Sequence, residues 1–238
     1  YTTLFRSTAF DYVLRFWLER EYNQVESKPW VAHQGLNLAQ LTEMKTTTKD
    51  GREFSEVIAS IEQRHHEYLE TGEMTDELLA STLDLARFDW IYRSGRPPEN
   101  LGQALEGDIE DLRCLYDIIP RDVFQGANHV LLNPTFGSAS RLVSGADADI
   151  VLDEMLVDIK TVKNLKLKPD YWRQLVGYVV LADLAGDELD EMPRFSEVGI
   201  YYARHGTLWR SSATDIYEHE KYEQFKGWFC EKAEEHFG

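Results

Sequence analysis

Cysteine is scarce in this chain of 238 residues, which contains only Cys114 and Cys230. Two cysteines that lie far apart cannot form a disulfide framework. They also cannot supply the four thiolates of a structural zinc site or an iron–sulfur site. We therefore expect no disulfide-stapled fold and no iron–sulfur cluster.

Long apolar runs are also missing. The uninterrupted apolar stretches span only a few residues, whereas a transmembrane helix needs about 20. The first ten residues lack the layout of a signal peptide. We therefore expect a cytoplasmic protein with no membrane partner. The hydrophobic fraction of 43% still suffices for a core, either in one large domain or in a compact core with an appended lobe.

Positive charge is in short supply, with 25 Lys and Arg against 42 Asp and Glu and a formal net charge of -17. A nucleic-acid binder is expected to carry a basic surface, but the distribution of charge matters more than the sum. Residues 158–174 contain five basic residues against two acidic ones. Four of these basic residues are candidates for contacts with backbone phosphates: Lys163, Lys166, Lys168 and Arg173.

The most informative pattern lies beside this basic stretch. Residues 146–152 and 155–162 alternate in character on either side of Asp153 and Glu154, which is typical of a β-hairpin with a two-residue turn. The turn determines the register. It predicts four cross-strand pairs: Leu152 with Met155, Val151 with Leu156, Ile150 with Val157, and Asp149 with Asp158.

The last of these pairs places two carboxylates opposite each other in an otherwise apolar hairpin. Like charges at facing positions destabilise a sheet, so the pair indicates a divalent cation between Asp149 and Asp158. Side chains two residues apart share one face of a strand. Lys160 is therefore expected beside Asp158, and Asp147 beside Asp149, so that one face presents three carboxylates and one ammonium group.

The N-terminal part of the chain is predicted to be helical. Apolar residues at three-and-four spacing, preceded by capping residues, predict helices there. A segment with two prolines and two glycines, residues 93–102, cannot continue a helix. We take it as the domain boundary, with a helical N-terminal lobe over residues 1–95 and a core over residues 96–238.

Strands and helices alternate in the predicted core. The residue patterns predict strands over 130–136 and 140–144, the hairpin described above, and a second hairpin of 195–203 and 207–211. They predict helices over 101–119, 169–185 and 217–237. The expected fold class is α/β (α+β), with a mixed β-sheet core flanked by helices.

Two helices of this core carry polar side chains that are candidates to complete a site at the hairpin. The helix over 101–119 has an acidic face with Glu106 and Glu110, which is either a solvated surface or the source of one more metal-binding carboxylate. Gln174 and Tyr178 stand at positions i and i+4 of the helix that follows the hairpin, so they project side by side.

These residues, in this order, resemble the motif of the PD-(D/E)xK nuclease superfamily. The helix with Gln-x-x-x-Tyr is similar to that of the RecB-like branch, which includes CRISPR-associated nucleases. The resemblance covers about residues 101–211 and implies a restriction-endonuclease-like core. It depends on three elements of sequence: Asp149, Asp158-Ile159-Lys160 and Gln174-x-x-x-Tyr178.

The resemblance implies metal-dependent hydrolysis of phosphodiester bonds, most readily in DNA. Asp149, Asp158 and the backbone carbonyl of Ile159 would hold Mg²⁺ or Mn²⁺, which take oxygen ligands and activate water. The branch places one Asp before the catalytic strand, and either Asp147 or Asp149 fits that position; the hairpin register favours Asp149. The branch also carries a His or Glu on the preceding helix, for which Glu110 is the candidate.

The same resemblance assigns roles to the remaining polar residues. Lys160 would position the nucleophile or neutralise charge on the phosphate, and Gln174 and Tyr178 would orient the strand or the attacking water. An alternative function is a nuclease-like fold that has lost turnover and binds nucleic acid or a partner protein in a repair or defence complex. The net charge of -17 favours this alternative, because so acidic a chain finds DNA poorly without a partner.

Overall fold

The structure is a computed structural model that describes residues 2–22, 24–98, 100–186 and 192–238. No helix in these ranges is both long enough and apolar enough to cross a lipid bilayer. The chain folds into two compact units. The helical unit contains Tyr1–Asn23 and Pro29–Ile119, and the sheet unit contains Gln24–Lys28 and Pro120–Gly238.

The division between the units lies after Ile119 and not near residue 95. The predicted boundary differs because α4 (Asp76–Ser94) ends at Gly95 but the helical packing continues beyond it. After the breaker segment, α5 (Glu106–Asp117) returns to pack against α4 and α1 (Thr2–Glu21). A glycine or proline ends an element, whereas the packing of apolar faces decides which elements form one unit.

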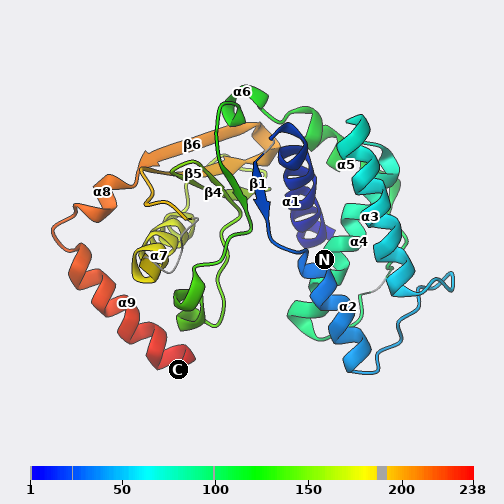
Figure 1. The fold of residues 1–238 in the computed structure, drawn as a ribbon, viewed down its shortest axis with the longest axis horizontal. Helices are drawn as coiled ribbons and strands as arrows, with labels where there is room; N and C mark the ends of the chain where they lie inside the picture. The colour runs from blue at the N-terminus through cyan, green and yellow to red at the C-terminus, as the bar shows by residue number, and fades with distance from the viewer. Residues whose placement is uncertain (1, 23, 99, 187–191) are drawn as a thin grey trace. The chain divides into compact units, whose positions relative to one another are not determined.

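Close packing between helices characterises the helical unit, in which α2 (Val31–Leu41) and α3 (Phe54–Thr71) also pack on α4 (Figure 1). At the α2–α4 contact, a Cβ placed on Gly35 would lie 2.1 Å from the carbonyl oxygen of Phe88. The absence of a side chain at Gly35 is therefore what allows the two helices to approach.

The helical unit also contains a buried polar network between α1 and α4. The hydroxyl of Tyr12 donates a hydrogen bond of 2.7 Å to Oδ1 of Asp89. The Arg15 guanidinium lies 4.2 Å from the centre of the Tyr12 ring, and its Nε lies 3.3 Å from Oδ2 of Asp11. Burial raises the pKa of Asp89 to about 7, against the opposing effects of the Tyr12 hydrogen bond and the Arg15 charge.

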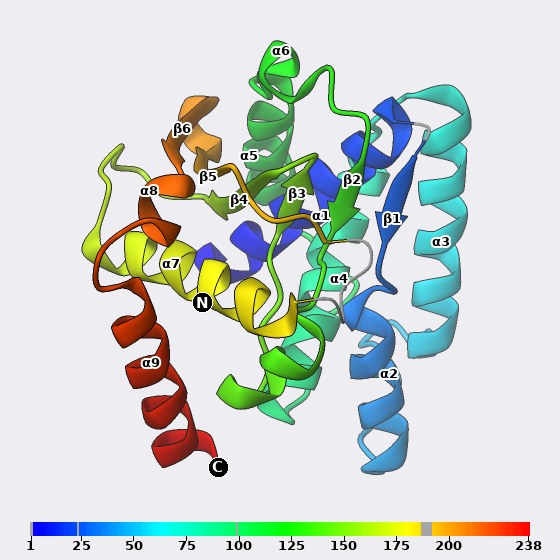
Figure 2. The same cartoon turned by 60° about the vertical axis from the view of Figure 1, so that its left-hand side comes forward.

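The sheet unit is built on a six-stranded mixed sheet in the order β1-β2-β3-β4-β5-β6 (Figure 2). Two neighbouring pairs, β1–β2 and β4–β5, are parallel and the other three are antiparallel. The predicted mixed sheet with helices is thus confirmed. The strands are β1 (Val25–Ser27), β2 (Val130–Leu132), β3 (Ile150–Leu152), β4 (Met155–Lys160), β5 (Glu197–Tyr202) and β6 (Thr207–Ser212).

Both predicted hairpins are present. In β3–β4 the pairs are Leu152 with Met155, Val151 with Leu156, and Ile150 with Val157, as the turn at Asp153 and Glu154 predicts. Asp153 has a φ of 48°, and its carboxylate accepts hydrogen bonds from the backbone amides of residues 128 and 129. The second hairpin joins β5 to β6 through the short 3-10 helix η3 (Ala203–His205).

The helix α7 (Pro169–Ala185) connects the parallel strands β4 and β5 and packs on the sheet (Figure 1). Its limits match the prediction, because Pro169 suits the first helical turn and Gly186 follows the last. The core beneath it joins apolar side chains of four strands to the helix. Its members include Leu131, Val151, Leu156, Val198, Ile200, Leu175 and Val179.

Two predicted strands are wrong in whole or in part. Residues 140–143 belong to a 3-10 helix, η1 (Gly137–Val143), which Ser144 follows with a left-handed φ of 58°. The hydroxyl of Ser140 accepts a hydrogen bond from the amide of Phe136 and donates one to the carbonyl of Ala146, so a side chain replaces the partners that a strand would need. The strand predicted over 130–136 ends at Leu132, because Asn133 adopts a left-handed φ of 51°.

The C-terminal helix is interrupted. Of its predicted range, 217–237, Tyr217 ends the short α8 (Thr214–Tyr217), and α9, which packs against η1, spans Tyr222–Phe237. The described part of the sheet unit also contains the short α6 (Arg121–Phe124). The strand β1 was not predicted, because it spans only three residues and precedes Lys28 and Pro29; it forms by pairing with β2 from a distant part of the chain.

Candidate functional site

One face of the β3–β4 hairpin changes from apolar to polar along its length. Val151 and Leu156 are paired and pack beneath α7. Side chains alternate along a strand, so Asp158 and Lys160 lie on the same face as Leu156. Asp149 stands at a bend just before β3, so its predicted pairing with Asp158 is not one of the cross-strand pairs. The charges of Asp149 and Asp158 both act on Tyr178 of α7, so both carboxylates lie near that helix.

Asp158 is almost fully buried, with 1% of its surface exposed. Its Oδ2 lies 2.7 Å from Nζ of Lys160. Burial raises the pKa of Asp158, while the neighbouring ammonium group of Lys160 opposes that rise. Because the desolvation of a buried carboxylate is only partly offset by one cation, a second cation near Asp158 would be stabilised.

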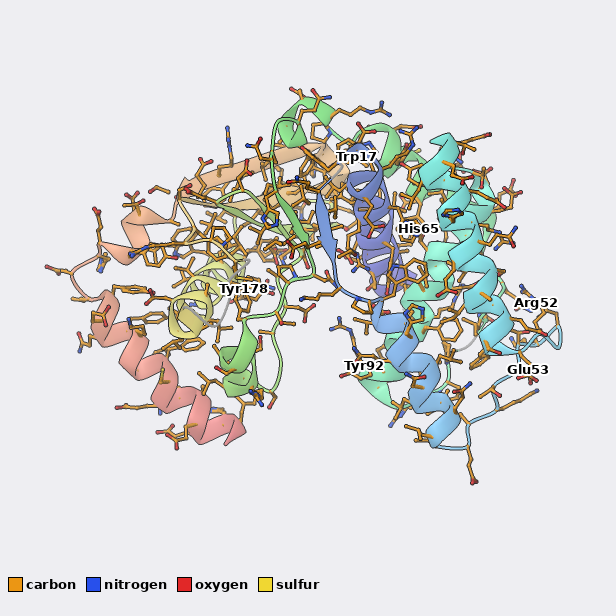
Figure 3. All side chains as sticks on the ribbon, viewed as in Figure 1. Trp17, Arg52, Glu53, His65, Tyr92 and Tyr178 are labelled. Atoms are coloured by element: carbon orange, nitrogen blue, oxygen red, sulfur yellow. The ribbon has the colours of Figure 1, made fainter. Side chains whose placement is uncertain are left out.

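A series of hydrogen bonds leads from Lys160 to α7. The ammonium group of Lys160 donates to Oε1 of Gln174 over 2.9 Å, and Nε2 of Gln174 donates to the hydroxyl of Tyr178 over 2.8 Å. Tyr178 is labelled in Figure 3. Its ring stacks on Phe136, with centroids 5.3 Å apart and an interplanar angle of 26°. Lys160 is therefore held in one place, between a carboxylate and an amide oxygen.

Asp149 reaches the same strand from the other side of the hairpin. Its Oδ2 accepts a hydrogen bond of 2.6 Å from the backbone amide of Ile159. Asp149 precedes the regular part of β3, and its own carbonyl accepts from the amide of Asn133. The carboxylate of Asp149 thus lies beside the Asp158–Ile159 peptide, next to the residue that the register predicted as its partner.

Asp147 lies further back along the same segment, where it forms an isolated bridge with Thr135 and is half-buried. Burial raises the pKa of the Tyr178 hydroxyl, and the negative charges of Asp149, Asp158 and Asp147 raise it further. All three carboxylates therefore lie within electrostatic range of one phenol. Of the two candidates for the first metal ligand, Asp149 has the direct contact with β4.

The structure adds two tyrosines that the sequence did not point to. The Lys160 ammonium group lies 5.1 Å from the centre of the Tyr171 ring. Tyr202, buried at the end of β5 and paired with Lys160, has its pKa raised by burial and by the charge of Asp158. No local sequence signal points to Tyr202, because it meets Lys160 through the parallel pairing of β4 with β5, two strands that α7 separates in the chain.

The remaining candidates are exposed residues. Glu110 is an exposed residue of α5 in the helical unit, as is Glu106. The basic candidates Lys163, Lys166 and Lys168 are exposed in the segment that joins β4 to α7. Arg173, whose side chain is 74% exposed, pairs with Asp170 at 2.7 Å.

The donor chemistry of the site suits a hard cation. Within the described ranges, no group of three or more His, Cys, Asp and Glu side chains is placed to hold a metal ion. Mg²⁺, however, uses one or two carboxylates and completes its coordination with water and substrate phosphates. The pair Asp149 and Asp158, with backbone oxygens nearby, fits that requirement and does not fit a zinc site, which needs nitrogen or sulfur ligands.

Comparisons of the chain with protein-family models, curated protein sequences and solved structures found no match. The contacts between β3, β4 and α7 are therefore the basis for any assignment of function.

Proposed function

We propose that the sheet unit is a metal-dependent nuclease that hydrolyses phosphodiester bonds in DNA. The observation that carries the proposal is the contact series that runs from Asp158 to Tyr178, with the Asp149 carboxylate bound to the amide of Ile159. These are the residue types and the order of the PD-(D/E)xK resemblance. A mixed sheet in which α7 links two parallel strands supports a restriction-endonuclease-like core.

Asp149 and Asp158 would hold the ion, with the carbonyl of Ile159 as a further oxygen donor and Asp147 as the alternative first ligand. Bound Mg²⁺ or Mn²⁺ would supply an activated water and neutralise charge on the phosphate. Asp158 suits this role because a buried, desolvated carboxylate is stabilised by a bound cation.

Lys160 and Tyr178 would act directly on the phosphate. The ammonium group of Lys160 has three donor hydrogens, and contacts with Asp158 and Gln174 orient it without using all of them. A tyrosine hydroxyl is protonated at neutral pH, and the raised pKa of Tyr178 keeps its proton in place at more alkaline pH as well. Since its oxygen accepts from Gln174, its own hydrogen is available to a phosphate oxygen or to the attacking water.

Exposed basic residues in the first turns of α7 and in the segment before it would bind the rest of the strand. Lys163, Lys166, Lys168 and Arg173 are solvent-exposed and adjoin the site along the chain. Contacts of basic side chains with backbone phosphates provide affinity without sequence information. We therefore expect cleavage with little sequence preference.

Cleavage of linear, nicked and single-stranded DNA in the presence of Mn²⁺ or Mg²⁺ tests the proposal. We expect activity that excess EDTA abolishes and that Asp149→Ala or Lys160→Ala lowers by about a hundredfold or more, the effect of removing one preorganised charge-stabilising group. Asp122→Ala is the matched control, since Asp122 is an exposed carboxylate on α6. Equal background cleavage by wild type and both site variants would rule the nuclease out.

A catalytically inactive nucleic-acid-binding or partner-binding module is the second candidate, favoured by the net charge of -17. Thermal unfolding with Mn²⁺ separates the candidates from an accidental carboxylate cluster. A native-state metal site at 100 times its Kd stabilises the fold by about 2.7 kcal/mol, and Asp149→Ala should remove that gain. Metal binding without cleavage of any DNA form would favour the inactive module.

A further inference from the structure

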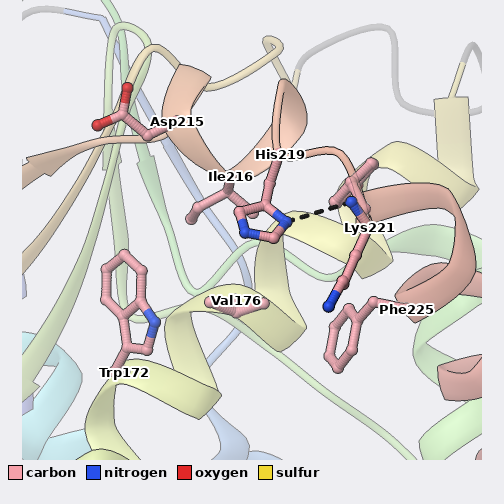
Figure 4. A pocket seen from close by; sticks show the side chains of 8 residues that line it. Trp172, Val176, Asp215, Ile216, His219, Lys221 and Phe225 are labelled. Atoms are coloured by element: carbon pink, nitrogen blue, oxygen red, sulfur yellow. Dashed lines mark hydrogen bonds between the residues drawn. The ribbon is translucent and has the colours of Figure 1, made fainter.

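A second concave site lies on the other side of α7. A pocket of about 320 Å³ opens between α7, α8 and α9 (Figure 4). Successive residues of a helix advance by about 100°, so Trp172 and Val176, which line the pocket, face away from Gln174 and Tyr178. The pocket and the carboxylate site therefore use opposite faces of one helix.

The interior of the pocket is apolar and aromatic. Val176 and Ile216 occupy its centre, with Trp172 at one end and Phe225 at the other (Figure 4). The rings of Trp172 and Trp209 of β6 form a T-shaped pair, with centroids 6.0 Å apart and an interplanar angle of 83°. This contact restricts the orientation of the Trp172 indole at the pocket.

Hydrogen-bond donors gather at the Phe225 end. Nδ1 of His219 accepts a hydrogen bond of 3.2 Å from the backbone amide of Lys221 (Figure 4), which leaves Nε2 as the donor of the neutral ring. Lys221 is exposed, and no carboxylate in the described part of the chain forms an ion pair with it. Asp215 stands at the opposite, Trp172 end (Figure 4).

We propose that this pocket binds an unpaired nucleotide, with the base stacked on Trp172 and the phosphate at His219 and Lys221. The volume lies at the small end of the range for ligand sites, about 300–1,000 Å³, which suits one nucleotide. Stacking on an aromatic ring tolerates any base, and a base within a duplex cannot reach the indole. The inference rests on the proposed function, for which it names the substrate class as a strand with unpaired nucleotides.

The basic segment lies where such a strand would pass. Lys168 immediately precedes α7, and the exposed Arg173 follows Trp172 directly. A strand seated in the pocket reaches the carboxylate face by crossing the first turn of a helix about 10 Å in diameter. Its phosphates would meet these two cations on the way.

Fluorescence anisotropy of a labelled single-stranded oligodeoxyadenylate, measured in excess EDTA, tests the pocket without cleavage. We expect Trp172→Leu to weaken binding about tenfold, the usual effect of losing one stacked base. Trp172→Phe should retain most of the affinity, and Lys221→Glu should lower it with no effect on folding, since Lys221 is exposed. Phe237→Leu, an exposed aromatic change on α9 outside the pocket, is the matched control.

Equal binding by wild type, Trp172→Leu and Lys221→Glu would overturn the inference, as would equal affinity for a blunt duplex. Binding of a fluorescent analogue of adenosine 5′-monophosphate without binding of the oligonucleotide would overturn the assignment to a strand and leave a free nucleotide as the ligand. Pocket-dependent binding in EDTA without any Mn²⁺-dependent cleavage would support the pocket while removing the nuclease. Cleavage that neither pocket variant affects would support the nuclease and overturn the nucleotide-binding pocket.

Discussion

Asp89 and Asp158 show how neighbours decide what a buried carboxyl group does. Burial raises the pKa of each. Asp158 lies 2.7 Å from the Lys160 ammonium group, and a further carboxylate, Asp149, binds the next backbone amide. Asp89 accepts a hydrogen bond from the hydroxyl of Tyr12, and this bond and the Arg15 charge oppose the rise in its pKa. The site of Asp158 can take a further cation, whereas at Asp89 desolvation outweighs the neighbours and favours protonation.

Protonation of Asp89 should make the stability of the helical unit depend on pH. The pKa of Asp89 is about 7 in the folded state, above the ordinary value of 3.8. The folded unit is therefore most stable below about pH 4, where Asp89 is protonated, and it loses stability as the pH rises to about 7. Asp89→Asn keeps the acceptor for Tyr12 and cannot ionise. Relative to wild type, the variant should gain about 1 kcal/mol per pH unit over that window, measured by urea unfolding.

Asp50 provides a control of opposite sign for this prediction. Its pKa is lowered, mainly by hydrogen bonds from Thr48 and Arg52, and it is exposed to solvent. Asp50→Asn should therefore lose stability relative to wild type above about pH 4 and match it in acid. A pH-independent difference between Asp89→Asn and wild type would contradict a folded-state pKa near 7.

Among the elements, the contact between α2 and α4 depends on a single missing side chain. A Cβ on Gly35 would lie 2.1 Å from the Phe88 carbonyl oxygen, a backbone atom that cannot rotate away. We expect Gly35→Ala to destabilise the helical unit by about 1–3 kcal/mol, the cost of overpacking. A thermal melt should show a decrease in Tm of several degrees.

Gly107 in α5 is the matched control for Gly35. An added Cβ there meets no atom within 4 Å, and alanine has the higher helix propensity by about 1 kcal/mol. Gly107→Ala should therefore leave the Tm unchanged or raise it. An equal loss of Tm in both variants would contradict a specific role for the α2–α4 contact, because Gly107→Ala introduces no such contact.

For the whole molecule, the net charge of -17 limits how strongly DNA is bound. The four basic candidates near α7 would neutralise about four phosphates, so a plot of log binding constant against log salt should have a slope of about -3 for single-stranded DNA. Lys166→Gln should reduce that slope by about 0.7. Binding titrations in EDTA at several salt concentrations measure both values.

Lys45→Gln is the corresponding charge control, since Lys45 is an exposed lysine of the helical unit. It should leave the salt slope unchanged. A slope that neither substitution alters would place the DNA contacts outside the segment before α7. A slope much steeper than -3 would require more basic contacts than this segment provides.

The elements that could be predicted from the sequence are those with strong local signals. The β3–β4 register follows from an alternating pattern around a two-residue turn, and the limits of α7 follow from Pro169 and Gly186. The strand predicted at η1 was wrong. The residues of this segment suit a strand, but the Ser140 side chain closes a loop through hydrogen bonds with backbone groups. A side-chain bond of this kind competes with strand pairing and leaves no periodic pattern.

The sequence alone determined the local geometry of the proposed site: two strands in register, a lysine two residues from an aspartate, and Gln174 one helical turn before Tyr178. Only the tertiary structure decided which parts of the chain meet. It joined Lys160 to Gln174 across the sheet–helix contact, brought Tyr202 to Asp158 through parallel pairing, and added β1 to β2. It also formed the pocket between α7, α8 and α9. The reason is physical, since periodicity records which face of an element is buried but not the surface that buries it.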